Sequence, residues 1–161
     1  PRVAEIVNVD TSDQTLMGHS LGGLTTLHAL FRRTASFQHF VAIAPSIWFN
    51  HREILDHEAG FVARVRGGEV SARALISVGE LESTLRYPTV GADKLPASKA
   101  DFQEMVEYCR MVPNTQELGA RLAAEQRPVF TVQTVIHMGD DHNMVPPAGI
   151  ARGIRFALRH G

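Results

Sequence analysis

The stretch Gly18-His19-Ser20-Leu21-Gly22 fits the pattern G-x-S-x-G and decides how the rest of the chain is interpreted. Residues 14–17 before it have the composition of a short strand, and residues 22–31 after it place leucine and phenylalanine side chains on one face of a helix. In this order the serine lies on a sharp turn between a strand and a helix, which exposes its hydroxyl beyond the edge of a sheet. The stretch therefore predicts a nucleophilic serine at the carboxyl end of a strand.

Three further segments predict strands, with helices between them. Residues 40–44 form a nearly continuous apolar run, typical of a strand buried on both faces of a parallel sheet, and residues 74–78 and 129–136 are also rich in strand-forming side chains. A capping-box pair, Asn50 and Glu53, predicts a helix that continues toward Arg66, and residues 83–96 are expected to form an irregular insertion. Strands that alternate with helices indicate an α/β fold, with a parallel sheet and helices on both faces, in one domain over residues 1–161.

The composition excludes several classes of protein. A net charge of −1 gives no electrostatic footprint for nucleic acid, and no apolar run is long enough to cross a bilayer. A single cysteine, Cys109, cannot form an internal disulfide, and its place on the apolar face of an expected helix indicates a buried, unreactive thiol. Neither a metal-ligand spacing nor a phosphate-binding loop with its lysine is present, so we expect no metal and no cofactor.

The serine requires partners that later segments of the chain can supply. A serine hydroxyl is a poor nucleophile at neutral pH, so Ser20 needs a base, and the base needs a carboxylate that orients it. His142 follows the last expected strand and is the predicted base, with His137 at the end of that strand as the alternative. Glu82 follows the third expected strand and is the predicted acid, with Glu80 as its alternative.

Four motifs in sequence order resemble the esterase branch of the α/β hydrolases. They comprise residues 18–23, 44–48, 78–82 and 139–142. The greatest similarity is to ferric-siderophore esterases that open enterobactin-type or bacillibactin-type trilactones. The resemblance implies the α/β-hydrolase fold, a small-molecule ester or ferric siderophore as substrate, and a role in iron uptake. The same fold also supports acyltransferases and thioesterases, and a fragment that binds a ligand without catalysis is a further alternative.

Carried over by position, the resemblance implies Ser20 as nucleophile, His142 as base and the backbone N–H of Leu21 as an oxyanion donor. Some siderophore esterases work with a serine–histidine dyad, so a role for Glu82 is implied less strongly. The base, the nucleophile and the donor are therefore the core of the expected site.

The resemblance also implies which residues face the substrate. Residues 45–48 would line the substrate side, which makes Ser46 and Trp48 candidate binding residues. His19, at the variable position of the serine motif, is a third candidate, with packing beneath the turn as its alternative. Further candidates around a bulky anionic substrate are Phe49, Arg86 and Tyr87.

The chain departs from the family at its beginning. Only 17 residues precede Gly18, whereas members of the family have a much longer segment there that carries the first strands and the second oxyanion donor. We therefore expect the carboxyl-terminal part of a hydrolase whose amino-terminal strands are missing. An open sheet edge would favour self-association or pairing with the missing fragment. A cytoplasmic location is expected, with the periplasm as the alternative.

Overall fold

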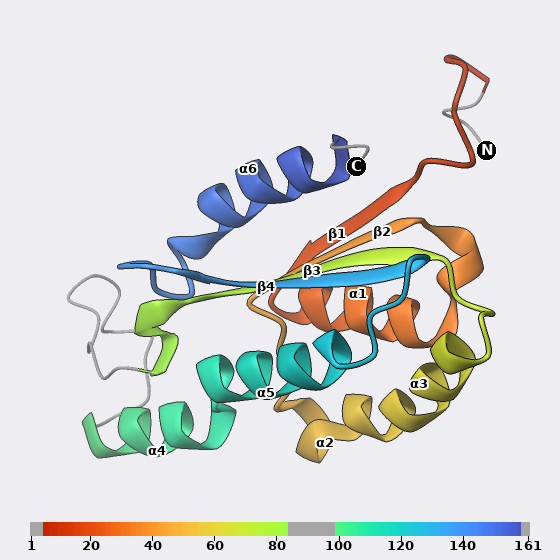
Figure 1. Cartoon of the computed structure of the whole chain (residues 1–161). Coiled ribbons are helices and arrows are strands. Elements are labelled where there is room, and N and C mark those ends of the chain that lie inside the picture. The colour runs from red at the N-terminus through yellow and green to blue at the C-terminus, as the bar shows by residue number, and fades with distance from the viewer. Residues whose placement is uncertain (1–4, 84–98, 159–161) are drawn as a thin grey trace.

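The computed structural model describes residues 5–83 and 99–158, which form a parallel sheet between two layers of helices (Figure 1). The sheet has four strands in the order β1-β2-β3-β4, so each strand lies beside the next one in the sequence. All three strand pairs are parallel. The strands are β1 (Thr15–His19), β2 (His39–Ile43), β3 (Ala72–Gly79) and β4 (Phe130–His137).

Helices connect the strands and cover both faces of the sheet. On one face, α1 packs on β1 and β2, α5 packs on β3 and β4, and α3 packs against α1. On the other face, α6 crosses the strands alone among the described helices (Figure 1). The helices are α1 (Leu21–Arg32), α2 (Phe49–Arg52), α3 (Glu58–Arg66), α4 (Lys99–Cys109), α5 (Met111–Ala123) and α6 (Val145–Leu158).

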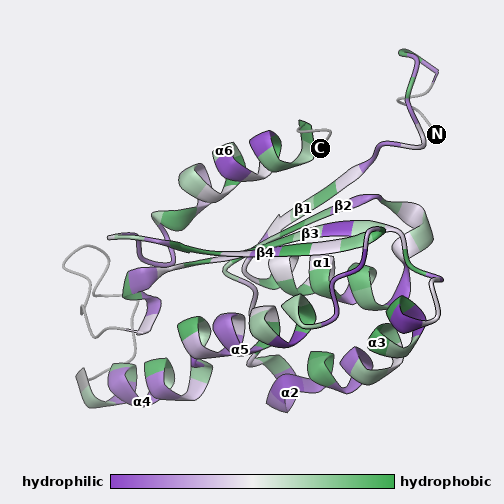
Figure 2. Cartoon of the chain, viewed as in Figure 1, coloured by the Kyte–Doolittle hydropathy of each residue, from purple (hydrophilic) through white to green (hydrophobic). Residues whose placement is uncertain are grey.

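The sheet separates two hydrophobic cores. The larger core joins alternate residues of the strands, including Phe40 and Ile76, to Leu27 and Leu118 from the helices below. The smaller core joins the intervening strand residues to Phe156 and Val145 of α6. Because β2 is buried along its whole length, its residues 40–43 are apolar without alternation. Figure 2 shows hydrophobic residues in the strands and in the helices on both sides.

The predicted α/β class and its parallel sheet are confirmed, but the single helix expected from Asn50 toward Arg66 is wrong. Asn50, His51 and Arg52 have positive φ angles of 46°, 55° and 67°. The segment therefore turns sharply and divides into α2, a 3-10 turn (Glu53–His57) and α3. The Asn50 side chain donates to the Glu53 carboxylate instead of capping a helix backbone. The insertion expected at residues 83–96 lies almost entirely outside the described residues.

No helix in the described ranges combines the length and the apolar character that a membrane crossing requires.

Candidate active site

Ser20 occupies a strained turn between β1 and α1. Its backbone has φ 59° and ψ −120°, a conformation that non-glycine residues rarely adopt and that stores about 1–3 kcal/mol. The Ser20 N–H donates to the Ile43 carbonyl at 3.0 Å, which fixes the turn to the end of β2. A Cβ at Gly18 would come within 2.2 Å of the Gly22 carbonyl oxygen, so the turn can close only with glycine there. The predicted strand, turn and helix thus occur in the expected order.

Glu82 lies in the 3-10 turn (Glu80–Ser83) that follows β3 and is buried. Its side chain is 1% exposed, and its Oε1 accepts the Gly79 N–H at 2.7 Å. Its Oε2 lies 2.7 Å from Nδ1 of His142. Both oxygens therefore have a partner, which offsets the cost of burying the carboxyl group.

His142 joins the carboxylate to the serine. Its Nε2 lies 3.0 Å from the Ser20 Oγ, and its side chain remains 39% exposed. Because a carboxylate oxygen accepts, Nδ1 carries the ring proton and Nε2 is left to accept the serine proton. Asp141 fixes the turn that carries the histidine, since its Oδ1 accepts the N–H groups of Asn143 and Met144 at 2.8 and 3.0 Å. The structure thus brings together Ser20, His142 and Glu82, which are 122 and 60 residues apart along the chain.

The loops that carry the acid and the histidine are tied to each other. The Leu81 N–H donates to the Asp140 carbonyl at 2.9 Å, and the Gly139 N–H donates to Glu80 Oε2 at 2.9 Å. A Cβ at Gly79 would come within 2.4 Å of the Asp140 carbonyl oxygen, so glycine permits this close approach. The Glu80 carboxylate thus supports the turn from outside, while Glu82 contacts the histidine.

His19 supports His142 from the side of the serine turn. Its Nε2–H donates to the His142 carbonyl at 3.0 Å, and the two ring centroids are 4.6 Å apart. Burial, together with the nearby His142, lowers the pKa of His19, which favours its neutral form. The structure therefore places this candidate binding residue against the histidine loop.

The backbone around the serine offers further polar groups. Leu21 is the first residue of α1, and the N–H groups in the first turn of a helix have no acceptor within that helix. The positive end of the helix lies at the same place and favours a developing negative charge. On the β2 side, the Ser46 N–H donates to the Ser20 carbonyl at 3.1 Å, and the two hydroxyl oxygens are 3.4 Å apart.

A cavity of about 310 Å³ opens beside Ser20, and we call it the Ser20 cavity. The candidate binding residues Ser46 and Trp48 line it, and Glu82 and His142 line it as well. Phe49 lies beyond Trp48 and is exposed. Arg86 and Tyr87, also predicted near the substrate, lie outside the described residues.

Helix α4 forms a wall of the Ser20 cavity that was not predicted from the sequence. Phe102, Met105, Val106 and Cys109 all line it. Their spacing predicts an apolar helix face, and such a face is expected in a core unless a neighbouring cavity is known. Cys109 is half-buried rather than buried as expected, because it lines this cavity, and its partial burial raises the pKa of its thiol.

His137, the alternative base, lies away from the serine. It lines a different cavity, between β4 and α6, that shares no lining residue with the Ser20 cavity. Among the described residues, no cluster of three histidine, cysteine or acidic side chains is arranged to hold a metal ion.

Comparisons with known proteins identify relatives of one kind. No family model matches the chain. It is 32% identical over 152 residues to the siderophore triacetylfusarinine C esterase of Aspergillus fumigatus, covering 94% of this chain and 51% of that protein. It is 29% identical over 158 residues to the ferri-bacillibactin esterase BesA of Bacillus subtilis, covering 98% of this chain and 47% of that protein.

A solved structure agrees. The siderophore hydrolase EstA from Aspergillus nidulans superposes with a TM-score of 0.76 at 32% identity, covering 88% of this chain and 46% of that one. The chain thus spans about half the length of the relatives it matches. The resemblance inferred from the four motifs is confirmed: the homologues of this chain are siderophore esterases with the α/β-hydrolase fold.

Proposed function

We propose that Ser20, His142 and Glu82 form a catalytic triad that hydrolyses the ester bonds of a siderophore through an acyl-enzyme. The observation that carries this proposal is the continuous hydrogen-bonded chain from Glu82 through His142 to Ser20, with distances of 2.7 and 3.0 Å. Ester hydrolysis by a serine nucleophile requires a base beside the serine and a group that orients the base, which is the arrangement seen here. The siderophore esterases among the relatives support the substrate class.

The reaction uses His142 twice. Ser20 Oγ bonds to the ester carbonyl carbon while His142 Nε2 takes the hydroxyl proton. The carbon–oxygen bond of the ester then breaks, and the departing alcohol oxygen receives that proton. In the second half a water oxygen bonds to the acyl carbon, gives its proton to Nε2, and the Ser20 ester breaks with return of the proton to Oγ. Glu82 keeps Nδ1 protonated throughout and stabilises the imidazolium that forms in each half.

The negative charge that develops on the carbonyl oxygen requires donors. The Leu21 N–H at the positive end of α1 is the donor that this chain offers beside Ser20. Losing one oxyanion donor typically costs about 10²–10³-fold in kcat, so the Leu21 donor is a large part of the expected rate.

The Ser20 cavity suits the acyl side of a bulky ester. Its lining by Trp48 and the apolar face of α4 favours aromatic or hydrocarbon groups of the substrate. Ser46 places a hydroxyl 3.4 Å from the Ser20 Oγ, where a polar atom of the ester can be bound.

Turnover of ferric siderophores tests the proposal. The chain is incubated with ferric triacetylfusarinine C and with ferri-bacillibactin, and the products are followed by liquid chromatography and mass spectrometry. We expect hydrolysis that Ser20→Ala and His142→Ala reduce to background, while Ser36→Ala, at an exposed serine of the 3-10 turn Thr34–Ser36, retains it. Absence of turnover in the unsubstituted chain, or turnover that survives Ser20→Ala, would contradict the proposal. An added alcohol acceptor distinguishes hydrolysis from acyl transfer.

A further inference from the structure

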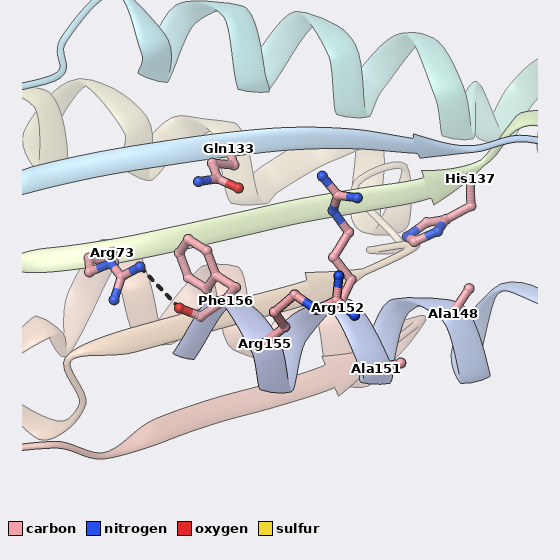
Figure 3. Close-up of a pocket in the computed structure, with 8 residues that line it drawn as sticks. All are labelled: Arg73, Gln133, His137, Ala148, Ala151, Arg152, Arg155 and Phe156. Atoms are coloured by element: carbon pink, nitrogen blue, oxygen red, sulfur yellow. Dashed lines mark hydrogen bonds between the residues drawn. The ribbon is translucent and has the colours of Figure 1, made fainter. Parts of the chain in front are cut away.

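The second cavity, of about 350 Å³, lies on the face of the sheet that α6 covers, and we call it the α6 cavity (Figure 3). Its polar lining comes from the beginning of β3, from β4 and from successive turns of α6. The residues that matter for its chemistry are Arg73, Gln133, His137, Arg152, Arg155 and Phe156. Because Ser20 lies in the other cavity, the mechanism above uses none of these side chains.

The described lining of the α6 cavity is rich in positive charge. Among its described residues it contains three arginines and no acidic side chain. Within the described ranges, neither Arg152 nor Arg155 forms an ion pair, and both are exposed. On the opposite side of the sheet, by contrast, Arg66 and Arg121 are each paired with a glutamate. The positive charges of α6 are therefore available to a ligand.

Arg73 is held in place at one end of the cavity. Its guanidinium donates to the Phe156 carbonyl at 3.0 Å and lies 4.7 Å from the centre of the Phe156 ring (Figure 3). These contacts hold the guanidinium in a fixed orientation at that end of the cavity.

His137 presents an unsatisfied polar atom at the other end. Its Nε2 is buried and has no hydrogen-bond partner in the described part of the chain. Burial lowers the pKa of His137, and Arg152 lowers it further, while Asp140 acts in the opposite direction. Figure 3 shows the Arg152 side chain extending from α6 over the strands, between Gln133 and His137. An oxyanion bound here could accept hydrogen bonds from the buried Nε2–H of His137 and from the guanidinium of Arg152, which would give the ring nitrogen a partner.

We propose that the α6 cavity binds a small multivalent oxyanion, a carboxylate or a phosphate. Planar guanidinium groups match the paired oxygens of both kinds of anion, and this favours them over spherical halide ions. The volume accommodates a small molecule. None of the described lining residues is a serine, a cysteine or an acid, so the proposed role is binding without chemistry.

Calorimetric titration at constant ionic strength tests this site independently of ester hydrolysis. Citrate and inorganic phosphate are titrated separately into the 161-residue chain, which distinguishes a carboxylate site from a phosphate site. Sodium chloride at matched ionic strength is the comparison for non-specific screening. We expect saturable binding of at least one of the two anions, with no saturable chloride binding.

Variants locate the binding. The double substitution Arg152→Gln and Arg155→Gln is expected to weaken binding of the anion at least about tenfold, because each substitution removes a charge-assisted hydrogen bond to it. Arg152→Lys keeps the charge without the planar fork and is expected to weaken binding less. Arg33→Gln, which removes an exposed charge at the end of α1 on the opposite face, is the matched control and should leave binding unchanged. Circular dichroism confirms that each variant is folded.

Three outcomes would overturn the proposal. They are no saturable binding of either anion, equal weakening by Arg33→Gln, and unchanged binding in the double variant.

Discussion

Replacing Glu82 by glutamine changes one atom of the proposed triad and leaves its shape intact. The Gly79 N–H donates to Glu82 Oε1 at 2.7 Å, so the amide oxygen must take that position, because the amide nitrogen would place two donors face to face. The amide NH₂ then points at Nδ1 of His142, which lies 2.7 Å from Oε2 in the unsubstituted chain. Since this nitrogen donates, Nδ1 must accept, and the ring proton moves to Nε2.

The consequence for Ser20 is severe. Nε2 lies 3.0 Å from the serine Oγ and, once protonated, can no longer accept the hydroxyl proton. Substituting the orienting carboxylate of a triad by its amide costs about 10⁴-fold in kcat, or roughly 5 kcal/mol of transition-state stabilisation. We expect a loss of about 10³–10⁴-fold in kcat for Glu82→Gln. Stability should change little, since the Gly79 contact is retained.

Steady-state hydrolysis of a p-nitrophenyl ester measures this loss, with thermal unfolding as the check on folding. Glu80→Gln is the matched control, because the Glu80 carboxylate accepts the Gly139 N–H and does not contact His142. Its amide oxygen can replace that contact, so we expect activity within a few-fold of the unsubstituted chain. An activity of Glu82→Gln within about tenfold of the unsubstituted chain, as expected for a serine–histidine dyad, would exclude this role for Glu82. An equal loss of activity in Glu80→Gln would exclude it as well.

Gly79→Ala should reduce kcat at least about 100-fold in the ester assay, because its Cβ would displace the Asp140 backbone and with it the turn that carries His142. Gly60→Ala is the control: a Cβ there meets open space, so its kcat should be unchanged in the same assay. The folded chain lowers the pKa values of His19 and His137 below the ordinary 6.5, so the unfolded chain binds protons at these two positions more readily than the folded chain does. Their contribution to the free energy of unfolding is therefore full above pH 6.5 and is lost as the pH falls below it. Urea unfolding between pH 7 and 5 should show this decline, and asparagine at both positions should flatten it. Strand β1 lies at one edge of the described sheet, so its outer backbone groups can pair with a strand of another chain. Light scattering should therefore show association that increases with protein concentration. A monodisperse monomer would contradict this prediction.

The strands and the serine turn were predictable because their signals are local. The apolar run that became β2 needs no distant information, since a strand covered on both faces is apolar throughout. Gly18 likewise supports the predicted turn, because the Gly22 carbonyl leaves no room for a Cβ at that position. Chain order then placed His142 and Glu82 at the same edge of a parallel sheet.

What could not be predicted depends on contacts between distant segments. The apolar face of α4 has the same spacing whether it joins the core or lines the Ser20 cavity. The break at Asn50, His51 and Arg52 comes from left-handed backbone angles that none of these residues requires. The contact of His19 with the His142 carbonyl joins positions 123 residues apart, and nothing in the motif itself specifies it.

Covalent labelling of the serine tests most directly whether Ser20 and His142 form an assembled nucleophile and base. The chain is treated with a fluorophosphonate probe, its intact mass is measured, and the modified peptide is mapped. We expect one adduct per chain at Ser20, abolished by His142→Ala and retained in Ser36→Ala. A chain that stays unlabelled, or that labels equally well without His142, would contradict the assignment of an assembled nucleophile and base.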